Sequence, residues 1–352
     1  MSAPAWTTKV AVETKPGTKR RRQKNIASHS RTLRDVAIAA GVSTASASRA
    51  LTRPDLVSED LKDQVERAAL ELGYVPNAAA QALSGHPRRL VGVVLGGLDE
   101  PVVLAILDAM AHHLASHDLA LLISIGADTK VETSKRVREL IGRGAEVVLF
   151  GNGAEPLRPV EEMRTNRVPW AGLDTTDRDQ DMDSAGGFDR ARAYALAIRY
   201  LGNLGHRRVA LLARDGARNA AAARAVMGKT DILLTHVKVG EPGVAAWVSS
   251  LRGMPTAPTA LVCESDAVAA ATIAACRQQG IALPEDLAIV GFGDSELARH
   301  TQPTLTTIRV PTREAGIAAA DYVVAVLEGR PVPVTQLAVK VIARESSGPF
   351  SA

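Results

Sequence analysis

The chain has 352 residues, 46% of them hydrophobic, and a formal net charge of +4 at pH 7. This length and composition predict a globular protein of two or three domains with a substantial buried core. Two cysteines are too few for a disulfide framework, and no stretch has the roughly 18 apolar residues of a membrane span or the form of a signal peptide. The sequence argues against a secreted or membrane-spanning protein, and we expect a cytoplasmic one.

The charges are unevenly distributed along the chain. Residues 1–90 hold 15 Lys or Arg against 8 Asp or Glu, whereas the remainder holds 27 against 30. A basic N-terminal part joined to a mildly acidic body predicts a polyanion-binding module on a carrier. Residues 1–30 have the composition of a disordered basic arm, which could touch phosphates or could be only a solvated leader.

Residues 32–51, TLRDVAIAAGVSTASASRAL, predict two short helices joined by a tight turn. Thr32 and Asp35 have the spacing of a capping box at the start of the first helix. Gly41 supplies the positive φ that ends this helix at low cost, and Ser43 caps a second helix. Two such helices form a helix-turn-helix, whose second helix enters the major groove of DNA.

Side chains near the start of the second predicted helix suit contact with DNA. Thr44 and Ala45 would be the most exposed to base edges, and Arg49 could reach either a phosphate or a guanine edge. Short hydroxyls on the same helix suit phosphate oxygens, although each could equally be a cap or a polar side chain in water; they are Ser43, Ser46 and Ser48.

Residues 58–73 predict a third helix, capped by Ser58, ended by Gly73 and apolar at a 3.6-residue period. Residues 78–84 favour a further helix but have almost no amphipathic face. A helix this short is marginal in water, so we expect it to fold only when something else orders it.

The pattern changes at residue 90 to apolar runs that alternate with helical stretches. The runs predict buried parallel strands; they are LVGVVLG, ALLISIG, EVVLFG, VPWAGLD, RVALLA, TALVCES and LAIVGFG. Repeated strand and helix units require an open α/β sheet with right-handed crossovers. We expect two such halves, with a ligand between them at the carboxyl ends of the strands.

Several of these segments resemble the LacI/GalR family of bacterial transcriptional regulators; they are TLRDVAIAAGVS, SRAL, VSEDLKDQVERAALELGYVPNAAAQALSG and RRLVGVVL. The resemblance covers about residues 32–348. It implies an all-α helix-turn-helix head over residues 31–76 and a hinge helix with a linker over residues 77–89. Residues 90–348 would form a two-lobed α/β domain like the type I periplasmic binding proteins, which binds the effector and dimerises.

The resemblance also implies roles for the hinge. The hinge helix would order on operator DNA in a dimer, and Leu83 matches the leucine that family members insert into the minor groove as a wedge. Taken alone, Leu83 could be an ordinary buried leucine. Three other residues outside the second helix complete the predicted DNA contacts: Thr32, Asn77 and Ala80.

Effector contacts follow from the same resemblance. Asp174 matches a pocket carboxylate that accepts hydrogen bonds from ligand hydroxyls, and Arg224 matches an arginine that binds sugar hydroxyls or an effector carboxylate. Trp170 could stack on a ligand ring or belong to the core. The remaining predicted contacts are Ser265, Asp266 and Asp294.

Several pocket positions depart from the family pattern. Gly293 replaces an aspartate, Ser265 replaces an asparagine, and Arg190 stands where asparagine is usual. These changes remove hydroxyl-binding groups and argue against an unmodified hexose. An anionic effector, such as a sugar acid or a phosphorylated sugar, would suit the retained Arg224, although this arginine could instead pair with a carboxylate of the protein.

The sequence therefore predicts a repressor whose operator affinity is controlled by a small effector, either an inducer or a corepressor. A homodimer would match its two-fold axis to a near-palindromic operator. The chain has no P-loop, no dinucleotide fingerprint and no cluster of Cys or His, so we expect no enzymatic activity, no cofactor and no metal. The resemblance makes His206 structural. The alternative function is a solute-binding protein without a DNA role, which the body alone would fit.

Overall fold

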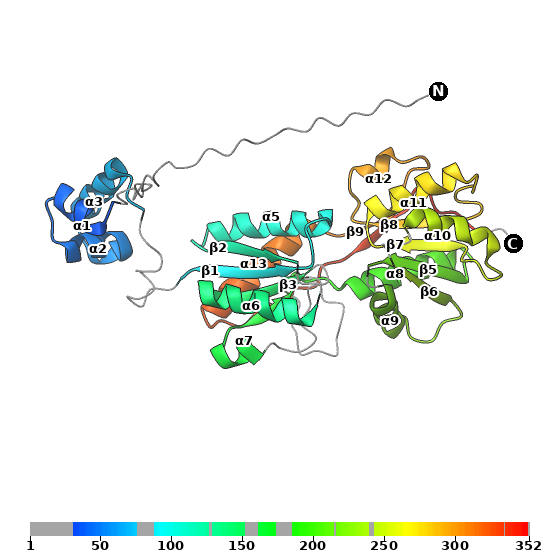
Figure 1. The fold of residues 1–352 in the computed structure, drawn as a ribbon, viewed down its shortest axis with the longest axis horizontal. Helices are drawn as coiled ribbons and strands as arrows, with labels where there is room; N and C mark the ends of the chain where they lie inside the picture. Colours follow the sequence, from blue (N-terminus) through cyan, green and yellow to red (C-terminus); the bar gives the residue numbers. More distant parts are fainter. Residues whose placement is uncertain are drawn as a thin grey trace, which may run out of the picture. The chain divides into compact units, whose positions relative to one another are not determined.

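The computed structural model describes residues 31–75, 88–126, 129–151, 161–173, 185–214, 216–238, 243–333 and 335–350. The chain divides into two compact units, Met1–His86 and Pro87–Ala352, which we describe separately (Figure 1). Within the described residues, no helix is long and apolar enough to cross a membrane.

The described part of the first unit, which we call the head, is all-helical. Its elements are α1 (Leu33–Ala39), α2 (Thr44–Thr52), a short 3-10 turn (Pro54–Leu56) and α3 (Glu59–Leu72). Small side chains let the three helices approach closely around a compact apolar core. The buried members of this core are Val36, Ala37, Ala40, Ala47, Ala50, Val65, Ala68 and Ala69.

The caps predicted for the head are present. The Thr32 hydroxyl accepts a hydrogen bond from the Asp35 backbone N–H at 3.3 Å, and the Asp35 carboxylate accepts one from the Thr32 N–H at 2.8 Å. These bonds lower the pKa of Asp35. Gly41 has φ +61°, and the Ser43 hydroxyl accepts from the Ser46 N–H at 3.0 Å. The helix-turn-helix therefore forms as local sequence signals predict, with α2 ending at Thr52 rather than Leu51.

Beside these caps, one long-range hydrogen bond in the head was not predicted. The Gln64 side-chain amide on α3 donates to the Ala40 carbonyl at the end of α1, at 2.8 Å. It fixes the turn around Gly41 to the third helix.

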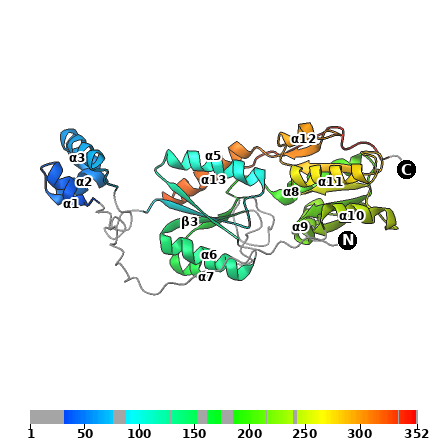
Figure 2. The same ribbon diagram turned by 45° about the horizontal axis from the view of Figure 1, so that its top comes forward.

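The second unit contains two sheets, each in its own lobe. In the N-terminal lobe, four parallel strands have the order β2-β1-β3-β4. Helices α5 and α13 cover one face of this sheet, and α6 and α7 cover the other (Figures 1 and 2). The elements are β1 (Leu90–Leu95), α5 (Pro101–Ala115), β2 (Ala120–Ile125), α6 (Lys130–Arg143), β3 (Ala145–Gly151), α7 (Glu161–Asn166), β4 (Trp170–Gly172) and α13 (Thr312–Leu327).

The C-terminal lobe has six strands in the order β10-β9-β8-β7-β5-β6, parallel except for the β9 and β10 pair. Side chains of α8 and α9 pack on one face of the sheet, and those of α10 and α11 pack on the other. The elements are α8 (Arg190–Asn203), β5 (Arg208–Ala213), α9 (Gly216–Met227), β6 (Leu233–Lys238), α10 (Val244–Ser250), β7 (Ala260–Cys263), α11 (Asp266–Gln278), β8 (Ala288–Phe292), α12 (Leu297–His300), β9 (Thr306–Arg309) and β10 (Lys340–Ile342); a short 3-10 turn (Leu251–Gly253) follows α10.

The seven predicted strands are present, but one expectation about burial was wrong. Strand β2 lies at the edge of its sheet, and Ile123 and Ile125 remain 39% and 41% exposed. Strands β6, β9 and β10 were not among these seven. Strand β6 is an edge strand with mostly exposed residues, and β10 has only three residues, so neither has the continuous apolar run by which buried strands are recognised.

One apolar cluster extends through both lobes. The largest buried cluster includes Val93 and Leu149 from the N-terminal sheet together with Leu211 and Val290 from the C-terminal sheet. The chain passes between the lobes three times: between β4 and α8, between β9 and α13, and between α13 and β10. Because strands of both sheets end near these passages, residues just beyond the strands meet at the junction of the lobes.

Candidate functional site

The exposed face of α2 carries most of the predicted DNA contacts. Four of them are exposed to solvent at the start of the helix or along it: Ser43, Thr44, Ala45 and Arg49. Thr32 is exposed at the start of α1. The hydroxyls of Ser43 and Ser46 hydrogen-bond each other at 2.8 Å, and Ser46 and Ser48 are half-buried. The first turn of α2 thus presents small side chains that allow close approach to a groove.

Charge distinguishes α2 from α3. Residues 41–54 include Arg49 and Arg53 and no carboxylate. Among the described residues, the Arg49 side chain has no ion-pair or hydrogen-bond partner. Helix α3 carries most of the acidic residues of the head, which are Glu59, Asp60, Asp63, Glu66 and Glu71. An anion is therefore favoured on the α2 side.

The predicted hinge contacts and one predicted effector contact lie outside the described residues: Asn77, Ala80, Leu83 and Asp174. Their roles stay predictions.

Ser265 and Asp266 follow strand β7 at the edge of the C-terminal sheet that faces the lobe junction. The Ser265 hydroxyl caps α11 by accepting from the Val268 N–H at 3.2 Å. The Asp266 carboxylate is only 2% exposed; it accepts from the Thr307 hydroxyl at 2.5 Å and from the N–H and hydroxyl of Ser295 at 2.7 and 2.8 Å. Asp266 therefore ties the start of α11 to β9 and to the segment after β8.

Asp294 lies at the same edge, just after β8, and is also engaged by the protein. Its two carboxylate oxygens accept from Arg344 and from Arg309, both at 2.5 Å, and its side chain is 3% exposed. Burial by itself would raise the pKa of Asp294, but the hydrogen bonds from the two arginines outweigh it and lower the pKa. The structure thus brings Ser265, Asp266 and Asp294 together, with their polar atoms bonded to neighbours.

Arg224 and Trp170 do not lie with this group. The Arg224 guanidinium donates to the carbonyl of Leu234 near the start of β6, at the opposite edge of the sheet from the strand ends. The protein itself thus engages Arg224, but through a backbone carbonyl and not through the carboxylate that the alternative predicted. Trp170 begins β4 and packs against the buried cluster under α6 and α7, which favours its role in the core.

The sequence did not predict that a set of charged residues at the lobe junction would contact one another. Glu100 and Arg190 form an ion pair at 2.6 Å, with each side chain only 7% exposed. The Arg190 guanidinium also lies over the Phe292 ring, 4.7 Å from its centroid. The replacement of the usual asparagine by Arg190 was the one signal in the sequence that could have identified this pair.

A second charged group lies at the same junction. Arg214, just after β5, pairs with Asp99 at 3.1 Å and with Glu264 at 3.6 Å, and its N–H donates to Glu264 at 2.7 Å. Burial raises the pKa of Glu264, against the effect of the bonds from Arg214. We call Asp99, Glu100, Arg190, Arg214 and Glu264 the junction charges.

His206 has a structural position. Its ring is buried, with Nδ1 3.0 Å from the Thr259 hydroxyl and Nε2 3.2 Å from the Gly348 carbonyl. Burial lowers the pKa of His206, although the bond to Gly348 opposes this shift. The residue joins β5 and β7 to the C-terminal segment.

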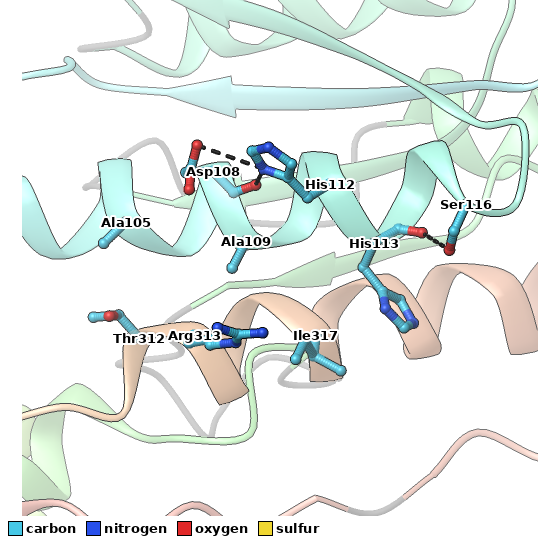
Figure 3. Close-up of a pocket in the computed structure, with 9 residues that line it drawn as sticks. All are labelled: Ala105, Asp108, Ala109, His112, His113, Ser116, Thr312, Arg313 and Ile317. Carbon is cyan, nitrogen blue, oxygen red and sulfur yellow. Dashed lines mark hydrogen bonds and ion pairs between the residues drawn. The ribbon is translucent and has the colours of Figure 1, made fainter.

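A groove of about 650 Å³ lies on the N-terminal lobe between α5 and α13 (Figure 3). Its lining includes the His112 ring and the Asp108 carboxylate, which are 3.6 Å apart, and the His113 ring, which contacts the Asp321 carboxylate at 2.9 Å. Arg313 and Ile317 of α13 form the opposite wall in Figure 3. The groove has no lining residue in common with the junction charges.

Comparison with sequence families gives two matches. Residues 32–77 match the family described as bacterial regulatory proteins, lacI family. Residues 198–347 match a periplasmic binding protein-like domain. The first match covers the described head, and the second covers most of the C-terminal lobe.

Curated relatives match over nearly their whole length. The HTH-type transcriptional regulator GalS of Salmonella typhimurium is 30% identical over 291 residues, which cover 80% of this chain and 85% of that protein. The HTH-type transcriptional repressor CytR of Escherichia coli K12 is 27% identical over 312 residues, or 86% of this chain and 91% of that protein.

Solved structures share the fold. The lac repressor dimer bound to operator and the anti-inducer ONPF has a TM-score of 0.73 at 23% identity, covering 90% of this chain and 99% of that one. A LacI-family regulator from Silicibacter pomeroyi has a TM-score of 0.74 at 22% identity, with the same coverage.

Proposed function

The chain belongs to the LacI family of bacterial regulatory proteins, and from that premise we propose that it is a transcriptional repressor that binds operator DNA through α2 under the control of a small-molecule effector. The DNA-binding role rests on α2, the second helix of a capped helix-turn-helix. This helix has an exposed face and contains no carboxylate. Such a helix fits the major groove with its first residues towards base edges.

The DNA-binding role can be tested without knowing the operator. Full-length protein would be used to select duplexes from a random pool, and the enriched sequence would then be footprinted. We expect a protected near-palindromic site that a chain lacking residues 1–89 fails to bind. Enrichment of no sequence, or specific binding by the truncated chain, would contradict the proposal.

The hinge carries the proposed coupling between effector and operator. Leu83 in the minor groove would cost a few kcal/mol of base unstacking, which contacts in the bent duplex offset. Effector and operator would then influence each other by a common coupling energy of about 1–3 kcal/mol. Leu83→Ala should weaken operator binding more than non-specific binding at fixed salt, measured by fluorescence anisotropy. Unchanged operator affinity would remove the wedge from the mechanism.

The effector is proposed to bind between the lobes, beside the junction charges. The anionic class that Arg224 suggested is better supported by Arg190 and Arg214, which lie at that junction, whereas Arg224 lies at the far edge of the sheet. A sugar acid or a phosphorylated sugar would supply the partner that a guanidinium fork prefers. Thermal-shift screening with sugars, sugar acids, sugar phosphates and nucleobases tests this class, and stabilisation by neutral sugars alone would exclude it.

A homodimer is the proposed DNA-binding form, because one small head buries too little surface for tight specific binding. The α5 and α13 face is suited to a second copy. It combines the 43% exposed Leu104 with both acidic and basic side chains, among them Asp108 and Arg313. Sedimentation of Leu104→Glu should show monomers where the unchanged protein shows dimers. A dimer of unchanged affinity would place the contact elsewhere.

The alternative, a solute-binding protein without a DNA role, would use only the second unit.

The curated relatives reported above are regulators rather than enzymes, which favours the prediction of no enzymatic activity. A cytoplasmic location remains a prediction that follows from the proposed role at DNA.

A further inference from the structure

The Glu100 and Arg190 pair joins the two lobes directly. Glu100 precedes α5 in the N-terminal lobe, and Arg190 begins α8 in the C-terminal lobe. Their charged groups are 2.6 Å apart, and each side chain is 7% exposed. Nearby, a Cβ on Gly293 would lie 3.0 Å from the Val102 side chain, so the lobes touch closely at this point.

The surroundings of Arg190 hold its guanidinium ready for an anion. Phe292 covers one face of the guanidinium at 4.7 Å. Asp189 already caps the first turn of α8 by accepting from the Ala191 and Arg192 N–H groups, at 2.8 and 3.2 Å. A planar guanidinium held in this way presents its fork to a carboxylate or phosphate with little further loss of freedom.

The Glu100 carboxylate already pairs with the Arg190 guanidinium, and it has no capping role. It stands at the residue before α5, yet its side chain makes no capping hydrogen bond to the helix. Two buried charges pay a large desolvation penalty, and apolar side chains of similar size would hold the lobes together at least as well. The buried Glu100 and Arg190 pair is therefore better explained if a ligand replaces one of its partners than if the pair serves to stabilise the fold.

We propose that Glu100 is an internal substitute for the effector: a carboxylate or phosphate on the ligand takes its place on Arg190 and so breaks this ion pair between the lobes. This rests on the proposed effector site and adds the identity of the recognising residue, the anionic group of the ligand and the contact that binding breaks. The neighbouring Asp99 and Arg214 pair, with side chains 65% and 42% exposed, is too solvated to be an equally strong link.

The first test is rescue by a small anion, measured as the thermal midpoint of the full chain without DNA. Glu100→Ala removes the carboxylate that pairs with a buried cation and should lower the midpoint by about 5–10 °C. Replacing potassium chloride by potassium acetate at constant ionic strength should restore several degrees in this variant and leave the unchanged protein unaffected. The double variant Glu100→Ala with Arg190→Met should not respond to acetate.

A second test measures competition in the ligand site. Titration calorimetry with gluconate, glucuronate and glucose 6-phosphate should show at least one of them binding Glu100→Gln about tenfold or more tightly than the unchanged protein, because the internal competitor is gone. Asp118→Asn, which alters the exposed Arg89 and Asp118 pair, is the matched control and should bind like the unchanged protein.

The proposal is overturned if acetate stabilises the double variant as much as Glu100→Ala, or if no anion of the panel binds Glu100→Gln more tightly. Neither assay contains DNA, so their failure leaves the repressor role intact. Conversely, rescue by acetate in a protein that selects no operator would count against the repressor role and not against the anion site.

Discussion

The α2 face of the head and the strand ends of the C-terminal lobe both carry predicted contact residues. The two groups of side chains differ in their exposure to solvent and in their bonds to the protein. Thr44, Ala45 and Arg49 are exposed, and Arg49 makes no polar side-chain bond within the described residues. Asp266 and Asp294 are buried and bonded to several neighbours each.

This difference follows from the two kinds of ligand. A DNA duplex approaches a surface from outside, so the residues that read it can remain in water until it arrives. A small effector is surrounded by protein, so polar groups at its site must be satisfied when the ligand is absent. Buried acids in the second unit therefore hold loops in place, and the change on ligand binding must be an exchange of partners.

The largest effect that would test this comparison is expected from Asp294→Asn. The substitution keeps the size of the side chain but leaves Arg344 and Arg309 without their carboxylate, so the free energy of unfolding should fall by about 3 kcal/mol. Urea denaturation measures the loss. Asp118→Asn, at an exposed ion pair, should change it by less than about 1 kcal/mol. If Asp294→Asn were as stable as the unchanged protein, the Asp294 carboxylate would serve a ligand and would not stabilise the fold.

Arg49→Ala should affect binding and not stability, because the side chain is exposed. Operator binding should weaken by about 1–3 kcal/mol, with relaxed specificity at one base pair if Arg49 reads guanine, or with a smaller salt dependence if it contacts a phosphate. Competition binding at two salt concentrations separates these cases. Arg67→Ala, an exposed arginine on α3, should bind as the unchanged protein does; a similar loss there would show that general charge and not α2 governs binding.

Gly41→Ala should destabilise the head by about 1 kcal/mol. A Cβ at Gly41 meets nothing within 4 Å, so the cost comes only from the backbone at φ +61°. Urea unfolding followed by helical circular dichroism would record it. Gly142→Ala is the matched control, because it also has open space but no positive φ, and it should be neutral or stabilising.

The smallest effect concerns His206 and pH. Because burial lowers the pKa of His206 below its ordinary value of 6.5, the unfolded chain takes up the proton first as the pH falls. Stability should therefore decline as the pH falls through about 6.5, with no contribution from this group at higher pH. The thermal midpoint of the unchanged protein relative to His206→Asn should decrease between pH 8 and pH 5.5. A constant difference would show that the ring takes up its proton over the same pH range in the folded and the unfolded chain.

The head was predictable in detail because its signals are local. Thr32 with Asp35, Gly41, Ser43 and Gly73 each act on backbone within a few residues, and all of them do so in the structure. The Gln64 bond to Ala40 was the exception, since nothing in a sequence marks which polar side chain will reach across a turn.

The predicted effector residues were less predictable because a strand end gives only an approximate place. Asp266 and Asp294 do lie at the expected edge, yet their bonds to Thr307, Ser295 and Arg344 come from residues up to 50 positions away. Arg224 shows the limit most clearly, because the resemblance identified the residue without showing which end of the sheet its guanidinium would reach.

The sequence by itself determined the helix caps, the turn, the seven apolar strands and the family, because each depends on neighbouring residues or on a pattern repeated along the chain. Tertiary structure alone decided which charges are satisfied by the protein and which remain in water. It placed Glu100 against Arg190, 90 positions apart, because only the packing of two lobes can bury both groups at one point. Electrostatic partners depend on distance in space, and that distance is set by the fold as a whole.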